Sequence, residues 1–224
     1  MARYIKGVEM LNQMVEKKSR EVGRPRSFSD EDAFQATTDL MIEHGAAGIT
    51  LADLARILGC TAPALNVRFG SRSGLLRAYY TWATQLDKQR FAQSREKYPS
   101  PLKALRSRFL LPSNDELEQV LDCSSQAKML SMFAEAQRDT KFAKLVSDRN
   151  AAFEAEIAQS LTAAMEAGEL KQADADQLAH VLFTGLIGAG YLWSVRQDGP
   201  VSNELGVIFD SVLAPYVSSG KKRK

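Results

Sequence analysis

The sequence predicts an all-α fold with a small N-terminal domain and a larger C-terminal helical domain. Two short helical patterns joined by a glycine fill residues 50–69, and amphipathic patterns flank them on both sides. Beyond residue 95, apolar residues again recur at helical spacing, in segments separated by proline-containing breaks. A chain of 224 residues that is 45% hydrophobic can bury a core in both parts.

The two short patterns predict a helix-turn-helix. Thr50 and Asp53 have the spacing of a capping box that begins the first helix, and Gly59 ends it in a left-handed conformation. Thr61 then caps the second helix, with Pro63 in the first turn, where a missing amide is tolerated. Because the chain turns within about three residues, DNA is the leading partner.

The second of these helices is expected to lie against DNA. Leu65 and Phe69 are one turn apart on the same face and are expected to pack inward. The outward residues, which would face the major groove, are Pro63, Ala64, Asn66 and Val67. Arg68 lies at the edge of the buried face, from which a long side chain can reach a phosphate.

Flanking helices are predicted to close a three-helix core around this unit. Upstream, Ser29 and Asp32 make another capping box, and the helix that follows runs to Gly45. Downstream, Ser71 caps a longer helix, and Arg72 lies in its first turn beside amides that favour phosphate. We therefore expect Arg72 to bind the DNA backbone.

These residues resemble the DNA-binding domain of the tetracycline-repressor (TetR) family of bacterial transcriptional regulators. The resemblance covers roughly residues 24–83 and depends on the spacing of Gly45, Thr50, Gly59, Phe69, Ser71, Leu75 and Leu76. It implies a homodimer in which each subunit has one helix-turn-helix and a helical body that binds a small-molecule inducer. The expected function is that of a transcriptional regulator released from a roughly palindromic DNA operator by its inducer, with repression as the first interpretation and activation left open.

The resemblance also implies DNA contacts for individual residues. Thr50 matches a helix-start residue that contacts a phosphate, and Arg72 stands where the family has a phosphate-binding lysine. The first residues of the recognition helix correspond to Thr61 and Ala62, and its groove-facing positions correspond to Pro63 and Ala64.

Two positions depart from the family pattern. Asn66 replaces an aromatic residue that touches the DNA backbone, and Ala62 replaces a lysine or another polar residue. Arg68 offers a phosphate contact instead, and Asn66 could hydrogen-bond an adenine edge; both interpretations stay open. These departures also leave open an alternative function, that of a helical ligand-binding or adaptor protein with lost or weak DNA binding.

Basic residues gather at the two ends of the chain, although its net charge is only +2. We assign residues 1–23 to an N-terminal extension and residues 219–224 to a basic tail. Arg24 and Arg26 lie in an arm that Pro25 keeps extended, so they are expected to reach a minor groove. The alternative is a flexible, solvated arm.

Residues 84–218 are predicted to form the ligand-binding and dimerisation domain. A helical bundle can enclose an apolar pocket, but the same residues suit a plain core, so no pocket residue is assigned. We interpret the apolar run at residues 178–195 as a buried helix rather than a membrane span, because His180 interrupts it. The resemblance implies that this helix and the last one form a four-helix interface with a second subunit. The two recognition helices would then be about 34 Å apart, or a multiple of that spacing.

No catalytic, metal or cofactor site is predicted. His44 and His180 have no second ligand or base at useful spacing, and we interpret His180 as a hydrogen-bonded core residue, with a pocket residue as the alternative. Cys60 and Cys123 give no disulfide framework or zinc site, which fits a reducing cytoplasm. The sequence therefore predicts a cytoplasmic regulator without enzymatic activity.

Overall fold

The computed structural model describes residues 28–110, 130–134, 136–137, 139–196 and 199–218. Over these residues the fold is all-α, as predicted, and its β-type pairing is limited to an isolated bridge between Leu170 and Val217. The elements are α2 (Asp30–His44), the short 3-10 helix η1 (Ala46–Gly48), α3 (Leu51–Leu58), α4 (Ala62–Phe69), α5 (Arg72–Lys97), α6 (Pro101–Phe109), α9 (Thr140–Glu166), α10 (Ala175–Arg196) and α11 (Val201–Leu213).

The predicted helix starts are confirmed. The Ser29 hydroxyl accepts from the amide of Asp32 at 3.0 Å, and the Asp32 carboxylate accepts from the amide of Ser29 at 2.9 Å, which completes a capping box for α2. The residues that cap α3, α4 and α5 are Thr50, Thr61 and Ser71. The capping box predicted at Thr50 differs in one hydrogen bond. The Asp53 carboxylate accepts from the hydroxyl of Thr50 at 2.6 Å, whereas a capping box would have it accept from the Thr50 amide.

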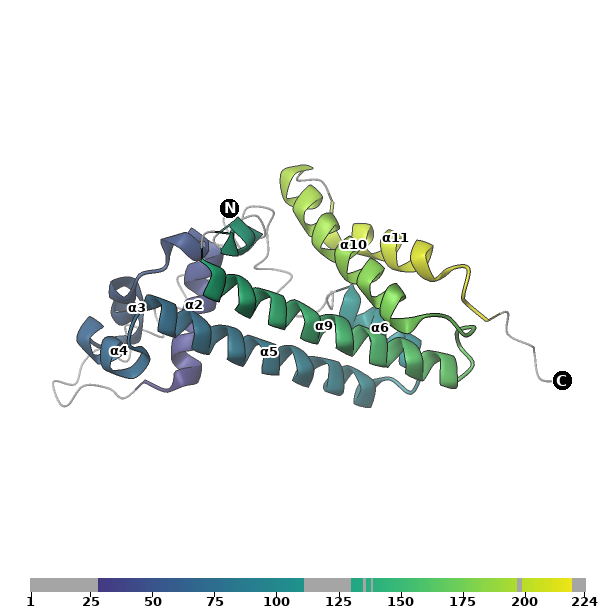
Figure 1. Ribbon diagram of the computed structural model, residues 1–224, viewed down its shortest axis with the longest axis horizontal. Coiled ribbons are helices and arrows are strands. Elements are labelled where there is room, and N and C mark those ends of the chain that lie inside the picture. The colour runs from purple at the N-terminus through teal and green to yellow at the C-terminus, as the bar shows by residue number, and fades with distance from the viewer. Residues whose placement is uncertain (1–27, 111–129, 135, 138, 197–198, 219–224) are drawn as a thin grey trace.

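Helices α2, α3 and α4 gather at one end of an elongated molecule, around the first turns of α5 (Figure 1). We call residues 28–83 the head. Its core consists of side chains that are almost fully buried, among them Leu40, Ile49, Leu54, Leu65 and Leu75. The three-helix core predicted around the helix-turn-helix is therefore present.

The rest of the described chain, from residue 84 to 218, is called the body. Helix α5 runs through both parts, so the boundary predicted at residue 83 falls inside a continuous helix. Helices α5, α6 and α9 pack together, and α10 lies between α9 and α11 (Figure 1). The head core also continues into the body, since Ala136, Phe142 and Val146 belong to the same buried cluster.

Helix α10 is the one described helix that is long and apolar enough to cross a membrane. It packs against both α9 and α11, as expected for a core helix. Gly185 permits this packing, because a Cβ atom there would lie 2.7 Å from the Ile208 side chain of α11. The expectation that α10 is buried all round is wrong, however, since Tyr191 and Val195 are more than half exposed.

His180 also differs from the prediction. Its side chain is 69% exposed, so it is not a core residue. The Nδ1 atom lies 3.1 Å from Oε2 of Glu154 on α9, which gives His180 a partner at the surface. The core position was predicted because apolar residues surround His180 in the chain, whereas helical geometry turns its side chain outward.

Candidate nucleic-acid interface

The turn between α3 and α4 has the geometry that the sequence predicts. Gly59 adopts the left-handed conformation, with φ 64° and ψ 32°, where a side chain would be strained. The Cys60 amide donates to the Ala55 carbonyl at 3.0 Å, and Thr61 caps α4 through the amide of Ala64. The turn therefore holds the second helix at a fixed angle to the first.

Helix α4 is anchored by one face. Leu65 is fully buried, and the Phe69 ring packs with Phe34 of α2 at 6.1 Å between centroids. The predicted outward residues Pro63, Ala64, Asn66 and Val67 are all exposed, and Val67 is 89% exposed. Ala62 behaves differently, because it is half-buried against the head core.

Arg68 forms an ion pair inside the head. Its Nε atom donates to Oδ1 of Asp30, in the first turn of α2, at 2.8 Å. This hydrogen bond raises the pKa of Arg68, and the charge of Asp30 adds to the effect. Arg68 thus connects α4 to the start of α2, at a position half open to solvent.

Arg72 is turned toward the backbone of the head. Its Nε donates to the Ile49 carbonyl at 2.9 Å, and a terminal nitrogen donates to the Ala46 carbonyl. The Ala46 amide in turn donates to the Ser131 hydroxyl of the body at 3.2 Å. Arg72 therefore holds the connection between α2 and α3, and its phosphate contact stays a prediction.

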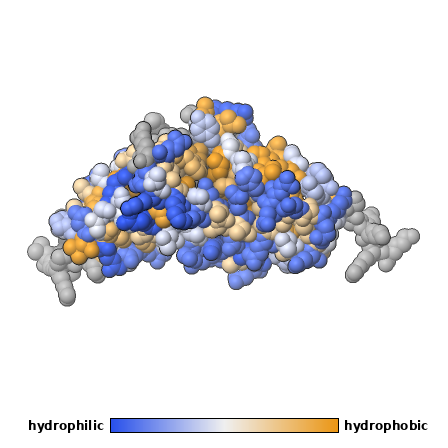
Figure 2. All heavy atoms as spheres, in the orientation of Figure 1, coloured by the Kyte–Doolittle hydropathy of each residue, from blue (hydrophilic) through white to orange (hydrophobic). Residues whose placement is uncertain are grey.

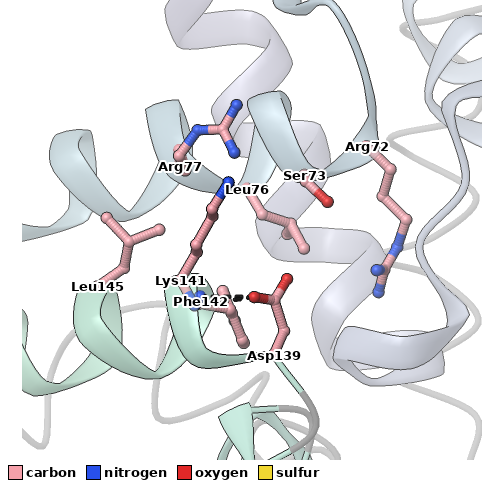
Figure 3. A pocket seen from close by; sticks show the side chains of 8 residues that line it. All are labelled: Arg72, Ser73, Leu76, Arg77, Asp139, Lys141, Phe142 and Leu145. Carbon is pink, nitrogen blue, oxygen red and sulfur yellow. Dashed lines mark hydrogen bonds between the residues drawn. The ribbon is translucent and has the colours of Figure 1, made fainter.

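A small cavity of about 20 Å³ lies beside Arg72, between the first turns of α5 and α9. It is lined by Arg72, Ser73, Leu76, Arg77, Asp139, Lys141, Phe142 and Leu145. Figure 3 shows that the Arg72 side chain points away from the other lining residues. The cavity can hold about one water molecule, so it marks the junction of head and body rather than a ligand site.

The remaining predicted contacts lie at the surface or outside the described residues. Thr50 is exposed, and its hydrogen bond is the main cause that lowers the pKa of Asp53. Arg24 and Arg26 lie outside the described residues, as do the N-terminal extension, the basic tail and Cys123. Cys60 is half-buried, and burial raises the pKa of its thiol, which fits the small apolar role expected of it.

Two family models match the chain. Residues 34–79 match the model of bacterial regulatory proteins of the tetR family, and residues 114–204 match the C-terminal domain of AefR-like transcriptional repressors. Together the matches span more than half of the chain. The chain belongs to the TetR family. It is therefore a TetR-type transcriptional regulator with an N-terminal helix-turn-helix, as the resemblance implied.

The relatives of this TetR-family chain match it over a short segment. The HTH-type transcriptional repressor BdcR of Escherichia coli (strain K12) is 37% identical over 62 residues, which make up 28% of this chain and 32% of BdcR. The match thus spans about a third of the length of that relative.

Solved TetR-type structures share the fold over both parts. A TetR transcription regulator from Haloarcula marismortui ATCC 43049 has a TM-score of 0.68 at 17% identity, covering 84% of this chain and 98% of that one. SmeT, the repressor of the Stenotrophomonas maltophilia multidrug efflux pump SmeDEF, has a TM-score of 0.64 at 21% identity, covering 87% and 93%.

Sequence reasoning missed the partners that hold the arginines of this TetR head. Asp30 lies 38 residues before Arg68, and no local pattern connects them. It also missed a buried carboxylate in the body, Asp87. A signal for Asp87 exists, since it falls in register with Tyr80, Ala83 and Phe91 on the buried face of α5.

Proposed function

We propose that this TetR-family protein is a ligand-responsive repressor that acts in the cytoplasm and binds a roughly palindromic operator as a homodimer. The observation that carries the proposal is the outward face of α4. It is built from small or short side chains, Pro63, Ala64, Asn66 and Val67, which allow a helix to approach base edges closely.

The proposed readout combines base contacts with DNA shape. Asn66 can hydrogen-bond an adenine edge, while Ala64 and Val67 can pack on thymine methyl groups. Thr50, Thr61 and the half-buried Ala62 lie at helix starts, where backbone amides and hydroxyls favour phosphate. Since few base contacts are available, sequence-dependent deformation of the duplex would supply part of the specificity.

The basic residues are proposed to supply the phosphate contacts. Arg68 and Arg72 are bonded within the head, so each would reach a phosphate only by leaving its present partner. Arg24 and Arg26 are proposed to reach an adjacent minor groove from the N-terminal arm.

The homodimer is proposed to form through α10 and α11. Exposed apolar side chains on these helices are Val181, Tyr191, Leu192, Val195 and Val207. On α10, Val181, exposed Gly188 and Val195 follow the seven-residue spacing of a helix-pairing stripe, and Tyr191 and Leu192 lie between the last two. Figure 2 shows orange, apolar surface over this end of the molecule. An apolar stripe on two adjacent helices supports a four-helix interface between identical subunits.

Ligand response is proposed to be a shift between two arrangements of the dimer. An open groove of about 460 Å³ runs along α9, beside Val146, Asn150 and Glu154, which is within the usual range of small-molecule sites. A ligand that binds one arrangement of the body more tightly would lower operator affinity by that difference.

A DNA-binding titration with one variant on the outward face tests the central proposal. Val67→Glu adds a negative charge to a side chain that is already solvent-exposed, so the fold should be unaffected. We expect it to weaken binding to DNA from upstream of its own gene by roughly tenfold or more, because the charge would face bases and phosphates.

Ala155→Glu is the matched control, since Ala155 is exposed on α9 far along the chain from α4. It should change DNA affinity little. If the native protein binds no duplex even at low salt, the adaptor function applies instead. If both variants bind as the native protein does, α4 is not the reading helix.

A further inference from the structure

A buried cluster of charges lies where α5, α6 and α9 meet. Asp87 of α5 accepts a hydrogen bond from Arg108 of α6 on one carboxylate oxygen, at 3.0 Å. Its other oxygen accepts from Arg149 of α9 at 2.6 Å. Asp87 and Arg108 are both more than nine-tenths buried. Two guanidinium groups therefore share one carboxylate inside the body; we call these three residues the arginine cluster.

The arginine cluster holds more positive than negative charge. Arginine stays protonated in proteins, so one aspartate faces two cations. Burial lowers the pKa of Arg108, and the positive charges of Arg90 and Arg149 lower it further, whereas Asp87 opposes them. A buried cation without a matching anion is costly, so the cluster is electrostatically incomplete as it stands.

Its hydrogen bonding is incomplete as well. The Nε atoms of Arg108 and Arg149 are buried and have no hydrogen-bond partner among the described residues. Buried polar atoms in native proteins are almost always paired, and a bound ion or water is one explanation of an exception. A guanidinium presents its donors as a planar fork, which matches the two oxygens of a carboxylate.

Aromatic rings surround the cations. The guanidinium carbon of Arg108 lies 5.1 Å from the ring centres of both Phe91 and Phe153. The Phe153 ring in turn lies 5.6 Å from that of Phe183 on α10. Such walls favour an apolar or aromatic group next to the charged one.

We propose that the arginine cluster is the anion-recognition point of the ligand site in the body, and that the ligand is an organic carboxylate with an apolar or aromatic part. The proposal rests on the ligand response proposed above and names the class of ligand, but it places the ligand at the arginine cluster, whose residues do not line the groove along α9. The carboxylate supplies the missing negative charge to Arg108 and Arg149, and the apolar part packs on Phe91, Phe153 and Phe183. Arg149 is 28% exposed and gives the anion access from the surface.

Helix α5 provides the connection to the head. Asp87 lies midway along α5, and Arg72 in its first turn holds the carbonyls of Ala46 and Ile49. An anion that competes with Asp87 for the two arginines loosens the contacts of α5 with α6 and α9. The same helix that senses the ligand thus supports the helix-turn-helix.

Calorimetric titration of the full-length protein tests the proposal, with octanoate and 2-naphthoate as probes. Octanamide and 2-naphthamide are the neutral comparisons. We expect at least one carboxylate to bind roughly tenfold or more tightly than its amide, since charged hydrogen bonds carry the recognition. Arg149→Met should abolish that preference while the melting temperature stays equal or rises, because Arg108 and Asp87 remain a balanced pair.

Lys88→Met is the matched control, since it removes an exposed positive charge from α5 that is not among the charges acting on Arg108. It should leave the preference intact. Asp87→Asn gives a second test, because removing the competing carboxylate should tighten carboxylate binding and make the melting temperature rise with added octanoate.

The proposal is overturned if neither carboxylate binds more tightly than its amide, or if Arg149→Met binds both as the native protein does. DNA release is measured separately. Release by a neutral compound in the absence of carboxylate binding would keep the ligand-responsive function and overturn this inference. Carboxylate binding lost in Arg149→Met, with DNA binding unchanged throughout, would support this inference and contradict ligand-controlled release.

Discussion

Arg68 lies on α4 and Arg72 in the first turn of α5, and each donates hydrogen bonds inside the head. Arg68 is paired with Asp30 at 2.8 Å, while Arg72 holds the carbonyls of Ala46 and Ile49. The first pair is half exposed, so it competes with water and contributes little to stability. The carbonyl contacts are less accessible and fix the backbone between α2 and α3. The two arginines therefore differ in how readily they can turn to DNA.

Asp30→Asn should release Arg68 for a phosphate. We expect tighter binding to all DNA sequences and a salt slope steeper by about one, because one more cation neutralises the backbone. Fluorescence anisotropy of a labelled duplex at several salt concentrations measures both. Glu31→Gln removes the same charge one residue away and is the control. Equal effects of the two variants would mean that overall charge, rather than release of Arg68, is responsible.

Arg72→Ala should lower the free energy of unfolding by about 1–3 kcal/mol, since two backbone carbonyls lose a charged donor. Urea denaturation measures this change, and Arg77→Ala, which removes an exposed arginine from the next turns of α5, is the control. Unchanged stability combined with a salt slope reduced by about one would instead identify Arg72 as a phosphate ligand.

Single elements were predictable where their signals are local. The capping residues Ser29, Thr50, Thr61 and Ser71 and the left-handed Gly59 set the helix bounds of the head, because each acts within a few residues of itself. The outward face of α4 followed from helical geometry in the same way. The predictions that were wrong concern residues whose surroundings are set by segments distant in the chain. His180 sits in an apolar run, yet the packing of α10 on α9 and α11 leaves its side chain at the surface, where it meets Glu154 of α9.

The turn between α3 and α4 depends on the absence of a side chain at position 59. Gly59→Ala should destabilise the head by about 1–2 kcal/mol, since an alanine is strained at a positive φ. Gly206→Ala is the contrasting variant, because Gly206 lies inside α11 and a Cβ there would meet neighbours at an ordinary 3.8 Å. It should be neutral or stabilising, and thermal unfolding distinguishes the two. Equal melting temperatures would contradict the strain attributed to Gly59.

At the scale of the whole molecule, the surfaces proposed for DNA reading and for subunit pairing lie on different parts of the chain. Helix α4 lies at the tip of the head, whereas α10 and α11 lie over the body (Figure 1). This separation allows each surface to be altered alone. The sequence predicted both surfaces, but it missed the arginine cluster, because Asp87, Arg108 and Arg149 come from three helices that meet only in the folded body.

Val195→Glu should separate the proposed dimer into monomers, because it places a charge within the apolar stripe. Sedimentation analysis measures the mass, and affinity for a two-half-site operator should fall toward that for one half-site. Val67→Glu is the reciprocal control, since it should stay dimeric and lose DNA binding. A Val195→Glu protein with the same mass and operator affinity as the native one would exclude this stripe as the subunit interface.

Tyr79 and Tyr80 of the head share a buried cluster with Phe142 and Val146 of α9, so the head is poorly suited to being joined to another domain. A fragment cut at residue 83 would leave both tyrosines without the partners that α9 supplies, and the exposed rings would favour aggregation. Chimeric regulators that join this reading unit to a foreign sensor would therefore need the first two turns of α9 to be carried along, or redesigned to fit.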